Sequence, residues 1–158
     1  MHMNDDFQQW LEETPTNMDQ WSLKGLEIGM KYLNLETAII SQIHNQVYVI
    51  QQAKSQLGDI FSAGDKFDLK DTYCEAVART GKTITYIQVG AIPEMQLHPV
   101  YMAVQLESYI GAPIYDSQKS IIGTLNFSDH GVRQVKFTQD EIDFIEQMAG
   151  KFSEVFNQ

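Results

Sequence analysis

The stretch ESYIGAPIYDSQKSIIGTLNFSD, residues 107–129, constrains the fold of this chain more than any other part of it. Two runs rich in β-forming residues, Ser108 to Tyr115 and Ser120 to Ser128, stand on either side of the polar segment Asp116 to Lys119. Strand-forming runs separated by a short polar break are typical of a β-hairpin. We therefore expect two strands joined by a turn here.

The second strand of this hairpin has one face that is unusually polar. Side chains alternate along a strand, so every second residue lies on the same face. One face is that of an ordinary core and contains Ile121, Gly123, Leu125 and Phe127. The other is polar over most of its length and contains Ile122, Thr124, Asn126 and Ser128. The role of Thr124 and Asn126 stays open at this point, and the plain interpretation is that they bind loop backbone or face solvent.

The rest of the chain shows helical patterns near both ends and mostly strand patterns between them. We expect a short helix over 5–13, an amphipathic helix over 18–33 after an N-cap at Asn17, two strands over 36–53 with a turn at 44–46, a loop-like segment over 55–70, a short helix over 71–81, a strand over 82–89, a short helix within 90–106, and a final helix over 137–156. No internal repeat or linker divides the sequence.

Two capping boxes mark helix starts. Thr72 with Glu75, and Thr138 with Glu141, each have the spacing at which the two residues satisfy each other's backbone N–H groups. Gly81 stands where a helix begun at Thr72 would need a left-handed residue at its C-terminus.

The final helix carries two apolar rows. The first comprises Ile142, Ile145, Ala149, Phe152 and Phe156, and the second comprises Phe144, Met148 and Val155. A helix that covers a sheet in a monomer needs one apolar face. The second row therefore predicts a homodimer through the terminal helices, unless a single wide stripe packs on one core.

Charge and cysteine content restrict the partners and the compartment. The formal net charge is −10 over 158 residues, and such a surface repels nucleic acid and anionic membranes. No apolar run approaches the length of a membrane span. A single cysteine excludes an intrachain disulfide framework and fits a reducing cytoplasm. The length suits one domain, which we place at 17–158 after an N-terminal extension or short helix at 1–16.

No catalytic or metal-binding pattern stands out. The chain has no Ser-His-Asp order, phosphate loop or paired catalytic carboxylates, and its histidines lack metal-ligand spacing: His2, His44, His98 and His130. Cys74 lies in an apolar turn and is expected to pack in the core, with a redox role as the alternative. We therefore expect a binding domain, with no catalytic residue, and not an enzyme.

Five motifs in order resemble those of a bacterial GAF domain. They are DTYC at the start of a helix (71–74), HP in a lid segment (98–99), YIG-P in a strand (109–113), IGTL in the next strand (122–125), and a final helix that follows Phe137. The resemblance extends over residues 34–156. It implies an α+β fold in which an antiparallel sheet carries the terminal helices on one face. A ligand pocket lies on the other face, under middle helices and loops.

The resemblance also implies a function. GAF domains are regulatory modules that bind cyclic nucleotides, tetrapyrroles or other small molecules and act on diguanylate cyclases, phosphodiesterases or histidine kinases. We expect a sensor that relays occupancy through its terminal helices, with cAMP or cGMP as the leading ligand and no certain cofactor. The alternative is a ligand-free dimerisation or relay module. The expected polar contacts to the ligand are Thr124 and Asn126 of the strand. Three tyrosines, Tyr73, Tyr101 and Tyr109, are expected to form an aromatic wall. The N-terminus of the helix that begins at Thr72 is expected to bind the phosphate.

Departures from the family pattern narrow the choice of ligand class. No Cys-His pair is present for a covalent bilin, and methionine-sulfoxide reductases of this family use several cysteines where this chain has one. A non-covalent tetrapyrrole or a redox sensor is therefore less favoured. Phosphodiesterase-type members carry Asn-Lys where this chain has Asp129-His130, so the lysine is missing.

Overall fold

The computed structural model describes residues 3–157, with side chains from Asp5 onward. The helices are α1 (Met3–Glu12), α2 (Met18–Leu33), α3 (Cys74–Thr80), α4 (Pro99–Val104) and α5 (Gln139–Phe156), with short 3-10 helices at Leu69–Asp71, Val89–Ala91 and Pro93–Met95. The strands are β1 (Thr37–His44), β2 (Val47–Ser55), β3 (Lys66–Asp68), β4 (Ile84–Tyr86), β5 (Ser108–Tyr115) and β6 (Ile121–Asp129).

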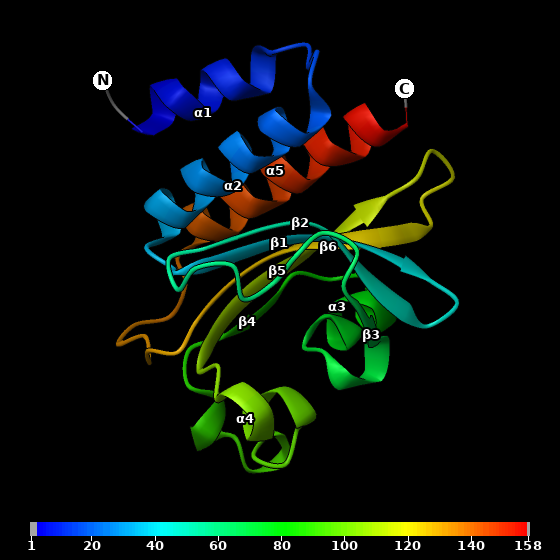
Figure 1. Cartoon of the computed structure of the whole chain (residues 1–158). Helices are drawn as coiled ribbons and strands as arrows, with labels where there is room; N and C mark the ends of the chain where they lie inside the picture. Colours follow the sequence, from blue (N-terminus) through cyan, green and yellow to red (C-terminus); the bar gives the residue numbers. More distant parts are fainter. Residues whose placement is uncertain (1–2, 158) are drawn as a thin grey trace.

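All strands belong to one antiparallel sheet in the order β3-β2-β1-β6-β5-β4. Helices α1, α2 and α5 lie on one face of this sheet, and α3 and α4 lie on the other (Figure 1). Each face has its own hydrophobic cluster of buried residues. The expected α+β architecture, with terminal helices on one face, is confirmed.

The hairpins and the long helices form where local signals place them. The turn between β1 and β2 contains Asn45 and Gln46, both in the left-handed backbone region. Asn17 Oδ1 accepts a hydrogen bond from the backbone of Gln20 and caps α2. At α5 the expected capping box is complete, because Thr138 and Glu141 each accept a hydrogen bond from the other's backbone N–H.

The capping box expected at Thr72 is wrong. The 3-10 helix Leu69–Asp71 precedes α3, and the Thr72 hydroxyl donates to the carbonyl of Leu69 at 2.9 Å. Tyr73 occupies the N-cap position and makes no capping hydrogen bond through its side chain. Gly81 does end the helix, with φ of 69°, as the sequence predicts.

Two expected elements differ in extent. The segment 55–70 is not only loop, because β3 pairs with β2 and extends the sheet at that edge. The strand expected over 82–89 is reduced to β4, three residues that pair with β5.

A β-bulge at the start of β6 changes which residues share a face. The pairing register shifts between Ile114 and Tyr115, so that Tyr115 lies opposite Ile121 while Ile114 lies opposite Gly123. Ile122 consequently packs against the cluster under the terminal helices, and Ile121 lines a hollow beside α3. The face expected for this pair is therefore wrong, whereas Leu125 and Phe127 do lie under the helices.

Helix α1 covers the apolar surface that α2 and α5 leave open. The indoles of Trp10 and Trp21 stack 4.4 Å apart, and each donates a hydrogen bond to the other's backbone carbonyl. Phe7 contacts Phe144, and Trp10 packs edge-on against Phe152, which is fully buried. The second apolar row of α5 is thus buried within one chain, and a partner subunit is not needed to cover it.

Candidate functional site

A partly open cavity lies between the sheet and the helices α3 and α4. Its volume is about 360 Å³, within the range of roughly 300–1,000 Å³ typical of small-molecule sites. The sheet contributes the floor, and α3, α4 and the segment before β3 contribute the walls. The lining residues are Ile39, Tyr48, Ile50, Phe61, Phe67, Asp71, Thr72, Tyr73, Cys74, Pro99, Val100, Ala103, Val104, Leu106, Tyr109, Asn126 and Ser128.

A network of polar side chains surrounds the Cys74 thiol at the floor. Cys74 Sγ lies 3.1 Å from the hydroxyl of Tyr109 and accepts hydrogen bonds from Thr124 Oγ1 at 3.2 Å and Asn126 Nδ2 at 3.3 Å. Asn126 Nδ2 also donates to the hydroxyl of Tyr48 at 3.1 Å. These residues come from β2, β5, β6 and α3, so the network ties the helix to the sheet.

Burial keeps this network uncharged. Burial raises the pKa of the Cys74 thiol, and hydrogen bonds from Thr124, Tyr109 and other neighbours offset only part of that rise. The pKa values of Tyr48 and Tyr109 lie well above the ordinary value, first through burial and then through the nearby thiol. At neutral pH the floor is therefore a set of neutral hydrogen-bonding groups, and the thiol carries little thiolate.

Two polar residues of β6 line the cavity beyond the thiol. Asn126 and Ser128 lie two residues apart on the same face, with exposed fractions of 4% and 3%. Both Asn126 hydrogen bonds use Nδ2. Within residues 5–157, Asn126 Oδ1 and Ser128 Oγ have no hydrogen-bond partner. These two oxygens are available to a molecule in the cavity.

Four of the six expected contact residues line this cavity: Thr72, Tyr73, Tyr109 and Asn126. Thr124 is fully buried beneath it, where its hydroxyl lies 2.7 Å from Ser41 Oγ. Tyr101 lies outside the lining, and its hydroxyl donates to Glu107 Oε2 at 2.9 Å. Because Glu107 also accepts from the backbone of Gly90, this contact connects α4 to the preceding loop.

Sequence reasoning missed several lining residues. Ser128 belongs to the same polar face as Asn126, and the alternation in β6 was the signal that pointed to it. Tyr48 carried a similar signal, since it shares a face of β2 with Ile50. Phe61 and Phe67 lie in the segment that was expected to be loop, where no periodicity marks them. Cys74 is buried as expected, but its thiol also reaches the cavity.

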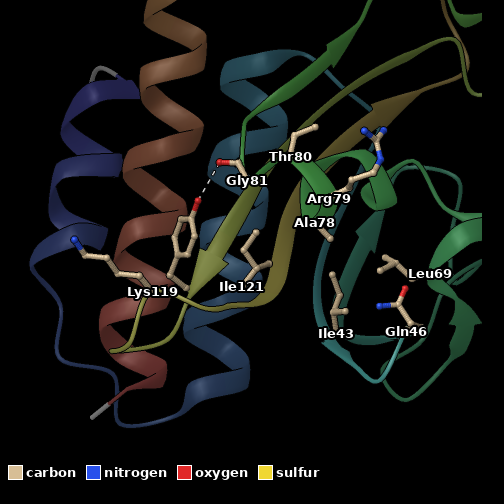
Figure 2. Close-up of a pocket in the computed structure, with 10 residues that line it drawn as sticks. Ile43, Gln46, Leu69, Ala78, Arg79, Thr80, Gly81, Lys119 and Ile121 are labelled. Carbon is tan, nitrogen blue, oxygen red and sulfur yellow. Dashed lines mark hydrogen bonds between the residues drawn. The ribbon is translucent and has the colours of Figure 1, made fainter.

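A second hollow lies at the other end of α3, between that helix and the two hairpin turns (Figure 2). It is larger, about 560 Å³, and it opens widely to solvent. Its two cationic side chains, Arg79 and Lys119, point away from each other in Figure 2, and Arg79 is paired with Glu75. The dashed contact is a hydrogen bond from Tyr115 to the carbonyl of Gly81. Because no buried polar groups converge there, the cavity between the sheet and α3 and α4 is the better candidate.

The described residues contain no cluster of side chains suited to a metal ion, and none of their helices is long and apolar enough to cross a membrane. His98 has a local role, since its Nδ1 accepts from the backbone of Val100 and caps α4. His2 lies outside the described residues.

Comparisons of the structure with solved structures find the same fold in several proteins. The GAF domain of an Acinetobacter phosphoenolpyruvate-protein phosphotransferase superposes with a TM-score of 0.76 at 12% identity, covering 97% of this chain and 91% of that one. A phycocyanobilin-bound GAF domain of a cyanobacterial phytochrome gives 0.73 at 12% identity, with coverages of 99% and 94%. The free methionine-R-sulfoxide reductase of Neisseria meningitidis, solved with its substrate, gives 0.72 at 13% identity, with coverages of 98% and 85%.

Fold and cavity together define an α+β domain with a hollow of small-molecule size on one face of its sheet. The sequence profile of the GAF domain matches residues 16–157, so the chain belongs to the GAF domain family. Domains of this family are generally regulatory and bind small molecules in signalling proteins. No curated protein matches the sequence significantly.

Proposed function

We propose that this GAF domain is a regulatory sensor whose ligand occupies the cavity between the sheet and helices α3 and α4. The observation that carries the proposal is the double role of β6. Asn126 and Ser128 on one face line the cavity, while Leu125 and Phe127 on the other belong to the core under α2 and α5. A ligand that moves β6 therefore acts on the packing of the terminal helices, which is the expected route to an output domain.

The cavity composition bears on the cyclic-nucleotide hypothesis. The rings of Tyr73 and Tyr109, together with the Asn126 amide, suit a base. The phosphate of cAMP or cGMP lacks a cationic partner, because the one charged side chain in the lining is that of Asp71. Helix α3 has only seven residues, so its N-terminus is a weak substitute. The lining therefore favours an uncharged ligand over either cyclic nucleotide.

Two other ligand classes are less supported. The volume of about 360 Å³ lies at the small end of the usual range, which disfavours a non-covalent tetrapyrrole. Burial raises the pKa of Cys74, so the reactive thiolate of a redox sensor is disfavoured at neutral pH.

Output and assembly are parts of the same proposal. A diguanylate cyclase, a phosphodiesterase or a histidine kinase is the kind of domain that such a sensor regulates, and a reducing cytoplasm suits its single cysteine. A homodimer through α2 and α5 requires that α1 first leave its place, because α1 covers Trp21 and contacts Phe144.

A ligand-free relay module is the second candidate. Most residues of the two apolar rows of α5 are buried within one chain, which gives this candidate less support than an open helix face would have given. The cavity has no role in such a module, so blocking the cavity would change nothing but stability.

A thermal-shift screen tests the proposal. The full chain is screened against a metabolite library that includes cAMP, cGMP and haem, and a ligand at 100 times its dissociation constant should add about 2.7 kcal/mol to the free energy of unfolding. Ala103 is an exposed residue of α4 that lines the cavity. Ala103→Trp places an indole there and should abolish the shift. Gly150→Ala, remote from the cavity, should retain it. Absence of any shift, or equal shifts in Ala103→Trp, would favour the ligand-free module.

A further inference from the structure

Ser128 Oγ and Asn126 Oδ1 are the two side-chain oxygens of β6 that lack a partner within residues 5–157, although both side chains are more than nine-tenths buried. The hydroxyls of two neighbouring lining residues, by contrast, are paired. The hydroxyl of Tyr73 donates to the carbonyl of Leu106, and that of Thr72 donates to the carbonyl of Leu69. A buried polar group without a partner is costly, so this pair points to a molecule that supplies one.

Both oxygens are open to the cavity. The only fully enclosed side-chain polar atom without a partner in residues 5–157 is Gln51 Oε1. Ser128 Oγ and Asn126 Oδ1 are therefore not sealed within packed side chains. Residues i and i+2 of a strand point to the same face, so both side chains meet the same side of a ligand in the cavity.

The two oxygens require complementary groups. The amide oxygen of Asn126 only accepts hydrogen bonds, so its partner must be a donor such as a ring N–H. The hydroxyl of Ser128 both donates and accepts, so a carbonyl beside that N–H completes the match. A lactam edge carries both groups in one plane.

The rest of the lining restricts the body of the ligand. Aromatic rings of Phe61, Phe67 and Tyr73 face the cavity, together with aliphatic side chains, and this suits a flat apolar body. Asp71 is the only charged residue of the lining, and the chain has a formal net charge of −10. An anion would be desolvated there without a cation to pair with it.

From these contacts we infer that the cavity takes an uncharged aromatic heterocycle with an N–H donor and a carbonyl acceptor on one edge, recognised by Asn126 and Ser128. This inference rests on the proposed sensor function and assigns its ligand class. Specificity comes from β6, the strand that also contacts the core under the terminal helices.

Calorimetric titration of the full chain tests the ligand class with 2-quinolone, a neutral bicyclic lactam, as the probe. N-Methyl-2-quinolone has the same shape without the N–H, and cAMP represents the anionic class. We expect 2-quinolone to bind at least about 5-fold more tightly than its N-methyl analogue, and cAMP not to bind.

Two variants of β6 separate recognition from folding. Ser128→Ala removes a hydroxyl that has no partner within residues 5–157, so it should weaken 2-quinolone binding about 5- to 150-fold and leave the urea midpoint unchanged. Thr124→Val lies on the same face beneath the cavity. It should lower the urea midpoint, because Ser41 and Cys74 lose a partner, and leave affinity unchanged.

The inference is overturned if 2-quinolone does not bind at millimolar concentration, if its N-methyl analogue binds equally, or if Ser128→Ala binds as the wild type does. A cAMP shift in the library screen that Ala103→Trp abolishes would overturn the neutral class and leave the sensor function standing. A library screen with no shift at all would remove both.

Discussion

At the scale of single residues, the cavity floor shows how position changes the chemistry of a cysteine. A thiol at a helix N-terminus usually has a lowered pKa. Cys74 begins α3, yet burial raises its pKa, because the enclosed site disfavours the thiolate more than its hydrogen-bonding neighbours favour it. Tyr48 and Tyr109, buried beside it, also have raised pKa values. The folded state therefore holds the protons of all three residues more tightly than the unfolded chain does.

This predicts that stability falls at alkaline pH. The stabilising contribution of a raised pKa is fully present below the pKa of the unfolded chain and is lost as pH rises toward the folded-state pKa. Above the ordinary thiol value of 9.0, the unfolded chain releases the Cys74 proton while the folded chain keeps it. The free energy of unfolding should then fall by as much as about 1.4 kcal/mol per pH unit for each such proton.

Urea denaturation from pH 7 to 10 measures this slope. Cys74→Ala removes the thiol and should flatten the slope just above pH 9, where the tyrosines do not yet contribute. If the wild type and Cys74→Ala have the same slope there, the thiol proton is not held more tightly in the folded state.

At the scale of elements, two glycines show opposite requirements within helices. A Cβ added to Gly25 of α2 would lie 2.5 Å from Trp10 Cζ2 of α1, closer than atoms can approach. Gly25 is thus the position where α1 rests on α2. A Cβ added to Gly150 of α5 would meet no atom within 4 Å, so nothing in the packing requires glycine there.

Alanine substitutions should therefore change stability in opposite directions. Gly150→Ala should raise the free energy of unfolding by roughly 0.5–1 kcal/mol, because glycine is unfavourable inside a helix. Gly25→Ala gains the same helical preference but should lose about 1–3 kcal/mol through the collision with Trp10. Urea denaturation, with tryptophan fluorescence for α1, measures both. A stabilised Gly25→Ala would mean that α1 does not rest there.

At the scale of the whole molecule, the packing of α1 decides what the terminal helices expose. The two apolar rows of α5 predicted a second subunit, and within one chain α1 and the sheet cover them. Trp10 has no exposed surface, and its stacking on Trp21 closes the helical layer. Any conformational change that reached α2 and α5 would therefore also change how α1 packs on them.

Deletion of residues 1–13 should promote self-association. The deletion removes the side chains that cover Trp21, Phe144 and Phe152, and exposed apolar surface of this kind favours a partner. Light scattering at micromolar concentration should show a larger mean mass for the truncated chain than for the intact one. Circular dichroism provides the control that the sheet remains folded. Equal masses for the two chains would show that α1 does not limit assembly.

The sequence by itself determined the elements whose signals are local. The capping box at Thr138 and the left-handed glycine at Gly81 each need only residues within a few positions. The alternation along β6 likewise identified a polar face that includes Asn126, since the period of a strand is set by its own backbone. For the same reason the two hairpins and the long helices were predictable, whereas β3, three residues without a periodic pattern, was not.

Tertiary structure alone decided which polar groups are paired. Thr124 and Asn126 look equivalent in the sequence, but Ser41 on the neighbouring strand satisfies the first, and no residue from 5 to 157 satisfies the oxygen of the second. The bulge opposite Ile121 and the covering of α5 by α1 also depend on strands and helices distant in the sequence. The donors and acceptors of a residue follow from its side chain alone. Which of them stay unpaired beside a cavity depends on elements that are distant in the sequence.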